Sequence, residues 1–185
     1  MTSRSRAFTL IEMMTTVAVL IIVLGLMVSL ARYVRNRSAT LLTRDLLAHL
    51  DLALDRYMSR PRGGGVPVVR PLAQPGQTLP DESLLLRAAE LNSNDVVVAL
   101  RNEFNAQTFF ASLPISIYDR RTLRDAWGTP VVLLATKHPA LGMAPQDRPF
   151  FVSAGPDRQF RTRADNLYSY EQTPLSSPPG QGKPE

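Results

Sequence analysis

Cysteine is absent from this sequence of 185 residues, and histidine and lysine are scarce. Without cysteine the chain has no disulfide, no cysteine-ligated zinc site and no thiol nucleophile. The two histidines, His49 and His138, lie far apart in sequence, which leaves little material for a histidine-rich metal site or a Ser-His-Asp triad. Because Lys137 and Lys183 are the only lysines, the formal net charge of +5 comes almost wholly from arginine.

Charge is missing from one long stretch near the amino terminus. No charged residue occurs from Met13 to Ala31, and an α-helix of that length spans about 30 Å, the hydrocarbon thickness of a bilayer. A secretory signal fits less well, because its apolar region is shorter and is followed by a cleavage site. Here Arg32, Arg35 and Arg37 follow the run directly. The sequence therefore predicts a membrane segment, for which a simple single-pass anchor is one interpretation.

One carboxylate interrupts the beginning of the apolar segment. Glu12 follows a short polar leader that carries Arg4 and Arg6 and no acidic residue. A carboxylate inside a bilayer costs on the order of 3 kcal/mol on insertion scales, so it is usually retained for a function. One interpretation places Glu12 at the interface, within reach of water. The other requires a cation: cleavage between Ala7 and Phe8 would create a new amine at Phe8, which would neutralise Glu12 of the next subunit in a bundle.

The string Arg-Ala-Phe-Thr-Leu-Ile-Glu at residues 6–12, followed by a long apolar helix, resembles the type IV prepilin (class III) signal of pilins and type II secretion pseudopilins. The family pattern has a short basic leader, usually a glycine, and then Phe-Thr-Leu-Ile-Glu; Ala7 stands here at the glycine position. The resemblance implies a leader at residues 1–7 and a transmembrane and polymerisation helix at 8–31. It also implies that a prepilin peptidase cleaves after Ala7 and N-methylates Phe8.

The helical pattern continues beyond the apolar run. No glycine or proline occurs from residue 32 to residue 60, and apolar residues recur at three- or four-residue spacing: Leu42, Leu46, Leu50, Leu54 and Tyr57. That spacing is typical of an amphipathic helix. We expect one continuous helix from Phe8 to about Ser59, whose second half, residues 32–59, lays one face on a globular domain. Two separate helices are the alternative.

Residues 60–122 match no pattern of the resembled family and are interpreted as an insertion of loop and short helices. The first part, residues 60–80, is rich in proline and glycine and predicts a loop. Asp81 is a candidate cap for a short helix that ends at Leu91. The stretch 93–104 suits either a second helix, capped by Ser93 or Asn94, or a strand through its three consecutive valines.

Strand and turn patterns fill residues 123–172. A turn at residues 127–130 precedes a β-prone run at 131–136, and a second short strand covers 149–153. These segments predict an antiparallel hairpin or meander. An antiparallel sheet packed on the long helix would bury the apolar faces of both, so we predict an α+β fold. The tail, residues 173–185, is rich in proline, serine and glycine and is expected to be disordered.

Local strings in this carboxyl-terminal part resemble the GspG-type major pseudopilin of type II secretion. They match its D-P-W-G-x-P box and its closing loop: Asp-Ala-Trp-Gly-Thr-Pro at 125–130, Ser-Ala-Gly-Pro-Asp at 153–157 and Asp-Asn-Leu-Tyr-Ser at 165–169. The resemblance implies a calcium ion in the loop, held by Asp157, Asp165 and Asn166, since calcium prefers carboxylate and carbonyl oxygens. Arg158 stands where the family usually has glycine, and two further arginines follow. A loop closed by Asp–Arg pairs is therefore the alternative.

Other polar residues have plainer interpretations. Asp119 and Asp125 flank three arginines and are interpreted as a solvated charged stretch, and no hydrolase, zinc-helix or dinucleotide motif occurs. We expect Trp127 to pack over the core, and His49 to be solvated or to face a partner. No enzymatic activity is expected. The arginines are scattered with few aromatics between them, which does not favour a nucleic-acid partner.

The resemblance implies a structural subunit of a pseudopilus filament in type II protein secretion. Its partners would be copies of itself, the prepilin peptidase, other pseudopilins, the inner-membrane secretion platform and membrane lipid. The family places the amino terminus in the cytoplasm and the carboxyl-terminal domain in the periplasm of a bacterium, whereas arginines on both sides of the run leave the positive-inside rule close to a tie. Alternatives are a type IV pilin or minor pilin (adhesion, motility, DNA uptake), or a membrane-anchored binding domain that never polymerises.

Overall fold

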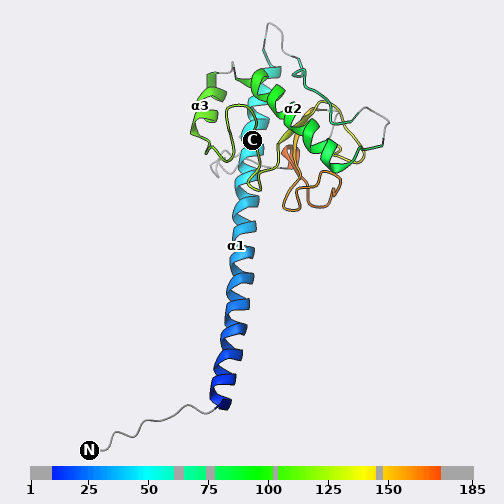
Figure 1. Ribbon diagram of the computed structural model, residues 1–185. Coiled ribbons are helices and arrows are strands. Elements are labelled where there is room, and N and C mark those ends of the chain that lie inside the picture. The colour runs from blue at the N-terminus through cyan, green and yellow to red at the C-terminus, as the bar shows by residue number, and fades with distance from the viewer. Residues whose placement is uncertain (1–9, 61–64, 74–77, 102–103, 145–147, 172–185) are drawn as a thin grey trace, which may run out of the picture. The chain divides into compact units, whose positions relative to one another are not determined.

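A computed structural model describes residues 10–60, 65–73, 78–101, 104–144 and 148–171. The chain forms two compact units, Met1–Ser38 and Ala39–Glu185, and α1 contributes to both (Figure 1). The elements, in chain order, are α1 (Leu10–Met58), α2 (Glu82–Leu100), α3 (Phe104–Ser112), β1 (Val132–Leu134), β2 (Phe150–Ser153), β3 (Leu167–Tyr168) and the 3-10 helix η2 (Ser169–Glu171). The α+β fold that the sequence predicts is confirmed.

Helix α1 confirms the predicted continuous helix, and its last backbone bond joins the Ser59 amide to the Asp55 carbonyl at 3.0 Å. In the second half of α1 the leucines recur with helical spacing. All buried residues of the helix lie in this half: Thr43, Leu46, Leu47, Ala48, Leu50, Ala53 and Leu54. Fully burying one leucine stabilises the fold by roughly 1.5–3 kcal/mol. The amphipathic half of the helix is therefore a structural part of the second unit.

The sheet is antiparallel with the order β1-β2-β3. Leu133 pairs with Phe151 and Val152 pairs with Tyr168. The predicted hairpin is confirmed, although β1 is shorter than residues 131–136, and the two-residue strand β3 was not predicted. Since side chains alternate across a strand, Leu133 and Phe151 join one core cluster with α1 and the end of α2, whereas Val132, Phe150 and Val152 join a second cluster with the start of α2.

Helix α2 corrects the prediction of two short elements in residues 81–104. It runs unbroken from Glu82 to Leu100, so the interpretation of the valines as a strand is wrong, and α3 was not predicted. Asp81 does occupy the N-cap position, but its side chain makes no capping hydrogen bond. Asn92 and Ser93 lie inside the helix and are completely buried. Ser93, which resembles a helix start in the sequence, therefore lies in the interior of α2 and contributes to tertiary packing.

These two side chains fasten α2 to the backbone of the sheet region. Asn92 Nδ2 donates to the Leu133 carbonyl at 3.0 Å, and Asn92 Oδ1 accepts from the Leu133 amide at 2.8 Å. Ser93 Oγ accepts from the Leu123 amide at 2.9 Å and donates to the Leu123 carbonyl at 3.0 Å. Each side chain therefore satisfies both backbone groups of one residue, which is needed when those groups are buried.

Arg148 forms a second polar connection, between α1 and the start of β2. Its Nη2 lies 2.8 Å from Asp51 Oδ2 and 2.7 Å from Asp55 Oδ1. Ser169 of η2 donates to Asp51 Oδ1 at 3.0 Å and accepts from the Phe151 amide at 3.0 Å. Asp51 and Asp55, one turn apart on α1, thereby bind Arg148 before β2 and Ser169 of η2. These contacts hold the carboxyl-terminal part of the chain against the helix.

Candidate functional site

The processing motif precedes and enters α1. Ala7 and Phe8 lie outside the described residues, and the helix is described from Leu10. Glu12 is exposed in its first described turn, and its backbone carbonyl accepts a hydrogen bond from the Thr15 hydroxyl at 3.0 Å. The cleavage site, the methylated amine and the pairing of Glu12 with a neighbouring subunit stay predictions.

The first unit exposes all of its described side chains. Every residue from Leu10 to Ser38 is exposed, including Leu20 at 60 % and Ile21 at 63 %. An 18-residue window of α1 has a mean hydropathy of 2.5, and none of it is buried within the fold. The helix is thus long and apolar enough to cross a membrane. An apolar surface of this extent is unfavourable in water, so it indicates membrane anchoring.

Exposed arginines directly follow the apolar run. Arg32, Arg35 and Arg37 lie on α1, and Arg37 Nη1 approaches the Tyr33 hydroxyl at 3.5 Å. Arginine and tyrosine are enriched where a membrane helix meets the headgroup region. Their position is consistent with an apolar segment that ends near Ala31.

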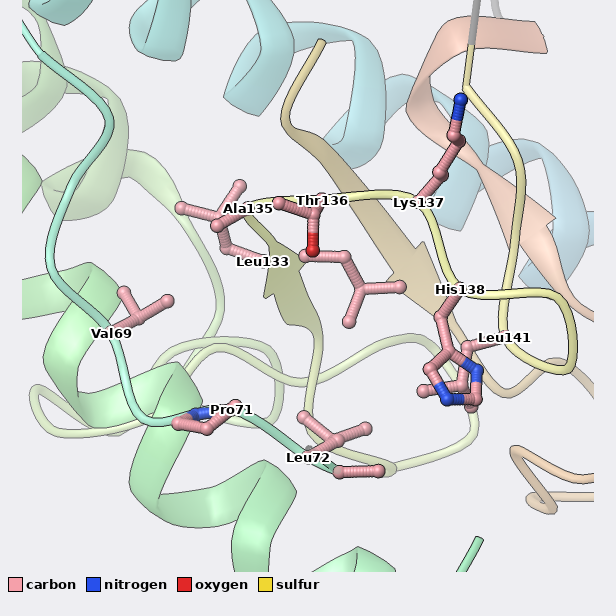
Figure 2. Close-up of a pocket in the computed structure, with 11 residues that line it drawn as sticks. Val69, Pro71, Leu72, Leu133, Ala135, Thr136, Lys137, His138 and Leu141 are labelled. Carbon is pink, nitrogen blue, oxygen red and sulfur yellow. The ribbon is translucent and has the colours of Figure 1, made fainter. Parts of the chain in front are cut away.

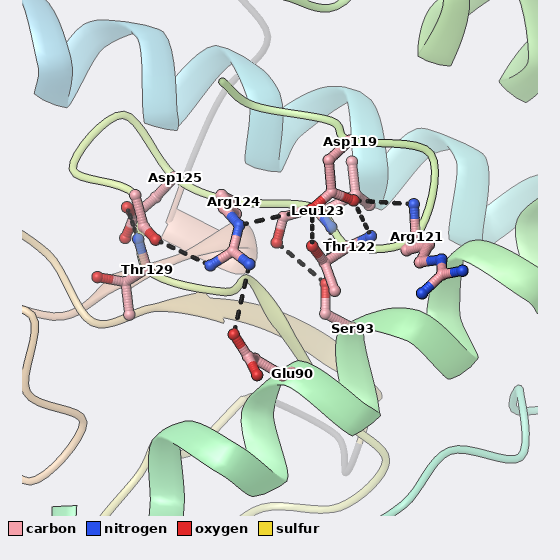
Figure 3. A network of polar contacts seen from close by, with 10 residues as sticks. Glu90, Ser93, Asp119, Arg121, Thr122, Leu123, Arg124, Asp125 and Thr129 are labelled. Carbon is pink, nitrogen blue, oxygen red and sulfur yellow. Dashed lines mark hydrogen bonds and ion pairs between the residues drawn. The ribbon is translucent and has the colours of Figure 1, made fainter. Parts of the chain in front are cut away.

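Asp125 organises the turn that carries the second sequence resemblance. Only 1 % of the residue is exposed, so the prediction of a solvated stretch is wrong at this position. Its Oδ1 accepts from the amides of Trp127 at 3.0 Å and Thr129 at 2.8 Å, the latter drawn in Figure 3. Its Oδ2 accepts from the Ser153 hydroxyl at 2.7 Å. Gly128 completes the turn with a φ of 89°, a conformation that favours glycine.

This turn also connects three parts of the second unit. The Ala126 amide donates to Thr43 Oγ1 of α1 at 3.1 Å, and Ser153 Oγ of β2 accepts from the Gly155 amide of the closing loop at 3.1 Å. Burial raises the pKa of Asp125, and hydrogen bonds from Ser153 and from the turn amides partly oppose that rise. The turn at Asp125–Pro130 therefore links α1, β2 and the closing loop by hydrogen bonds, and Asp125 accepts most of those within the turn.

Asp119 shapes the neighbouring turn in a different way (Figure 3). Its carboxylate accepts from the amides of Arg121 at 2.9 Å and Thr122 at 2.8 Å and from the Thr122 hydroxyl at 2.9 Å. Slight burial would raise the pKa of Asp119, but the hydrogen bonds from Thr122 and Arg121 outweigh it and hold the pKa below its usual value. Asp119 stays exposed, as the sequence predicts.

The closing loop lies between β2 and β3. A Cβ on Gly155, which has a φ of 71°, would collide with the Asp165 carbonyl, so the two backbones are in close contact. Asp157 Oδ1 accepts from the Gln159 amide at 2.9 Å, and Asn166 Nδ2 donates to the Phe160 carbonyl at 3.0 Å. Neither Asp157 nor Asp165 forms an ion pair with another described residue. Backbone contact and hydrogen bonds, rather than Asp–Arg pairs, hold this loop closed.

The loop does not fit a calcium ion well. Asn166 Oδ1 is buried without a hydrogen-bond partner among the described residues, so one of the three expected ligands does offer an available oxygen. Asp157, however, uses a carboxylate oxygen within its own turn. No group of three histidine, cysteine, aspartate or glutamate side chains within the described ranges is arranged to hold a metal ion. Calcium binding by Asp157, Asp165 and Asn166 stays a prediction.

The histidines lie in separate structural settings. His49 is partly exposed, and its ring stacks on Phe109 of α3 with 5.2 Å between centroids, so its partner is within the chain. His138 borders a pocket of about 90 Å³ beside β1, which Val69, Leu72 and other apolar side chains line (Figure 2). Pockets that hold small ligands usually measure about 300–1,000 Å³. This pocket is too small for such a role.

The polar residues that join the elements of the second unit were not predicted from the sequence. A usable signal existed for Asn92 and Ser93, because two adjacent polar residues interrupt the apolar face of α2. No comparable signal marks Arg148, whose partners Asp51 and Asp55 are distant in sequence. Long-range ion pairs of this kind depend on the tertiary arrangement and leave no local pattern.

An apolar, fully exposed helix behind a short basic leader is the arrangement of precursors with a pilin-like leader. Comparison with protein families supports this class: the model described as the prokaryotic N-terminal methylation motif matches residues 2–28. A search of curated proteins and a search of solved structures found no match. The motif implies processing by a prepilin peptidase and pilin-type assembly. The match covers the leader and the first part of α1 only, so the more specific assignment is a proposal.

Proposed function

We propose that this chain is the precursor of a pilin-like filament subunit, a pseudopilin of type II protein secretion. One observation carries the proposal: the methylation motif at residues 2–28 leads directly into a helix whose described residues are all exposed as far as Ser38. Such a surface requires lipid around it before assembly and other apolar helices around it afterwards. The proposal assigns the chain no catalytic step.

The proposed sequence of events begins in the bacterial inner membrane. The leader lies in the cytoplasm and the second unit lies in the periplasm. The prepilin peptidase then cleaves after Ala7 and methylates the Phe8 amine. Identical subunits then contact one another through unlike surfaces, and a contact that does not close into a ring gives a helical filament. In the apolar bundle, Glu12 of one subunit pairs with the Phe8 amine of the next. That pairing fixes the axial register, because an unpaired charge there is costly.

Mass spectrometry of the mature protein tests the processing step. The full chain is produced with an active prepilin peptidase and, as a control, with an inactive one. We expect a mature chain that begins with N-methylated Phe8 in the first case and an intact leader in the second. Ala7→Gly, which restores the residue usual in the family, should be processed at least as completely. A chain that still begins at Met1 or Thr2 beside the active peptidase would support a simple membrane anchor instead.

Glu12→Gln tests the assembly step separately. It keeps the size of the side chain and removes the charge, so we expect normal cleavage at Ala7 but loss of incorporation into filaments. Glu12→Asp keeps the charge and is the matched control, expected to retain part of the assembly. Crosslinking in native membranes measures the result, because filament subunits give a ladder of oligomers. A normal ladder from Glu12→Gln would reject the pairing role.

The assignment to type II secretion, rather than to type IV pili, is supported by the Asp125–Pro130 string and its place at the centre of the second unit. Deletion of the gene discriminates between the two: loss of protein export with normal motility and DNA uptake supports a pseudopilin, and the reverse supports a pilin or minor pilin. A chain that never crosslinks to copies of itself would be a membrane-anchored binding domain.

A further inference from the structure

Three arginines from separate parts of the second unit line one open pocket of about 420 Å³. Arg87 belongs to α2, Arg124 precedes β1, and Arg158 lies in the closing loop. Ser83 and Glu90 of α2 lie on the same pocket. The volume is within the range of pockets that bind small molecules. The pocket thus joins guanidinium groups that the sequence places far apart.

The pocket has more positive charge than its own acidic residue can balance. Arg124 Nη2 donates to Glu90 Oε1 at 3.3 Å (Figure 3). Arg124 Nη1 donates to the Gly128 carbonyl at 3.3 Å. The side chains of Arg87 and Arg158 form no hydrogen bond or ion pair with any described residue. Glu90 therefore serves Arg124, and an excess of two positive charges faces the pocket.

The backbone around the pocket adds two features. Arg158 has a φ of 60°, which is unfavourable for a residue with a Cβ, and such conformations are often retained at functional sites. Ser83 lies in the first turn of α2, where the helix dipole favours anions, and the Asp81 side chain does not cap that end. The amino-terminal end of α2 thus contributes Ser83 to the pocket, and the closing loop contributes Arg158.

We propose that this pocket binds a phosphate group that carries two negative charges. Arg87 and Arg158 donate to its oxygens, and the Ser83 hydroxyl is a further donor. A carboxylate fits less well, because it carries one charge and Glu90 already supplies a carboxylate there. A phosphate balances both arginines and matches the fork of a guanidinium. The proposal concerns residues that filament assembly through α1 does not use, so it stands independently of the function proposed above.

Titration of the purified full chain in detergent micelles with inorganic phosphate, followed by calorimetry, tests the proposal. Arg158→Gly and Arg87→Gln should each weaken phosphate binding about tenfold or more, the loss expected for a charged hydrogen bond. Arg161→Gly is the matched control, since Arg161 is exposed in the same loop but does not line the pocket. It should change the affinity less than about twofold. Equal weakening by all three variants, or no binding by the parent chain, would overturn the proposal.

Arg158→Gly also separates binding from folding. Glycine accepts a φ of 60° without strain, so this variant should unfold at the same temperature as the parent chain or a higher one. A loss of phosphate affinity in a chain of equal or greater stability can then be assigned to the missing guanidinium. Loss of affinity that occurs only together with a lowered unfolding temperature would count against the site.

Two sources of the phosphate group can be distinguished with the same protein. The chain is reconstituted in phosphatidylcholine bilayers with or without phosphatidic acid, whose headgroup is a phosphomonoester. If phosphatidic acid prevents the binding of inorganic phosphate in the parent chain, the headgroup reaches the site; if it does not, the ligand is a soluble phosphate. Both outcomes support a phosphate site. Binding of polyglutamate without binding of inorganic phosphate would overturn it in favour of an acidic peptide.

Discussion

The two units of this chain use apolar side chains in opposite ways, although α1 contributes to both. From Leu10 to Ser38 every residue is exposed, whereas Leu47, Leu50 and Leu54 further along the same helix are completely buried. The pattern of the sequence separates the two cases. Uncharged and mostly apolar residues fill the first part from Met13 to Ala31, whereas apolar residues alternate with charged residues in the second. Continuous apolar character suits lipid or a bundle, and periodic character suits a single packed face.

The largest contrast is expected from the same truncation made in each unit. Leu50→Ala removes a completely buried side chain and should lower the free energy of unfolding of the second unit by about 2–5 kcal/mol. Leu24, 52 % exposed, should change it by less than about 0.5 kcal/mol when replaced by alanine. Denaturation followed by the fluorescence of Trp127, the single tryptophan, measures both. Similar effects at the two positions would remove the distinction between the units.

Glycine gives the next sharpest comparison. Gly155→Ala forces a Cβ into the Asp165 carbonyl at a φ of 71°, so we expect a loss of about 2–4 kcal/mol and an opened closing loop. Gly25→Ala meets nothing within 4 Å and should favour the helix by roughly 0.5–1 kcal/mol. Circular dichroism and hydrogen exchange of the loop amides report the two effects. An undisturbed loop in Gly155→Ala would show that the backbone contact is not required.

Two aspartates should give opposite dependences on pH. Burial raises the pKa of Asp125 in the folded state above its unfolded value, so its stabilising contribution is present at low pH and is lost as the pH rises through the folded pKa. Hydrogen bonds lower the pKa of Asp119, so its contribution is present at neutral pH and is lost as the pH falls. Subtracting the Asp125→Asn and Asp119→Asn stability curves from that of the parent chain should give slopes of opposite sign.

At neutral pH Asp125→Asn should also cost about 1–2 kcal/mol, because an amide replaces a carboxylate that accepts three hydrogen bonds. Urea denaturation at several pH values provides these data. Difference curves of the same sign would contradict the assignment of burial to Asp125 and exposure to Asp119.

The smallest expected effect is at Arg148. Arg148→Gln removes its ion pairs with Asp51 and Asp55 and should cost about 1 kcal/mol, since Arg148 and Asp55 are both partly exposed to water. Part of that loss should disappear in high salt, which screens the pair in the parent chain. Arg56→Gln, at an exposed position of α1 next to Asp55, is the control and should have no measurable effect. An equal loss in both variants would point to a general effect of removing an arginine charge rather than to the ion pairs.

The long helix and the β-hairpin could be predicted from local sequence patterns. The long helix followed from the absence of glycine and proline after residue 32, and the hairpin followed from β-prone runs on either side of a turn-rich stretch. The leader motif was predicted from its string of residues, and the match at residues 2–28 supports it. Each of these signals is contained in a short window of the chain.

The features that were missed depend on residues far apart in sequence. Ser93 was interpreted as a helix start because serine usually caps helices, but its hydroxyl is bonded to the backbone of Leu123. Asp125 was interpreted as solvated because arginines surround it in the sequence, yet Ser153 and two turn amides enclose it. The strand β3 has two residues and exists only because β2 lies beside it. In each case the tertiary arrangement overrides the local preference.

The side chain of Asn92 has one further consequence. β1 lies at the margin of the sheet, where an outward amide and carbonyl would ordinarily attract a strand from another molecule. At Leu133 the side chain of Asn92 hydrogen-bonds both the amide and the carbonyl, as a neighbouring strand would do. The edge of β1 is therefore blocked at Leu133 against pairing with a strand of another copy.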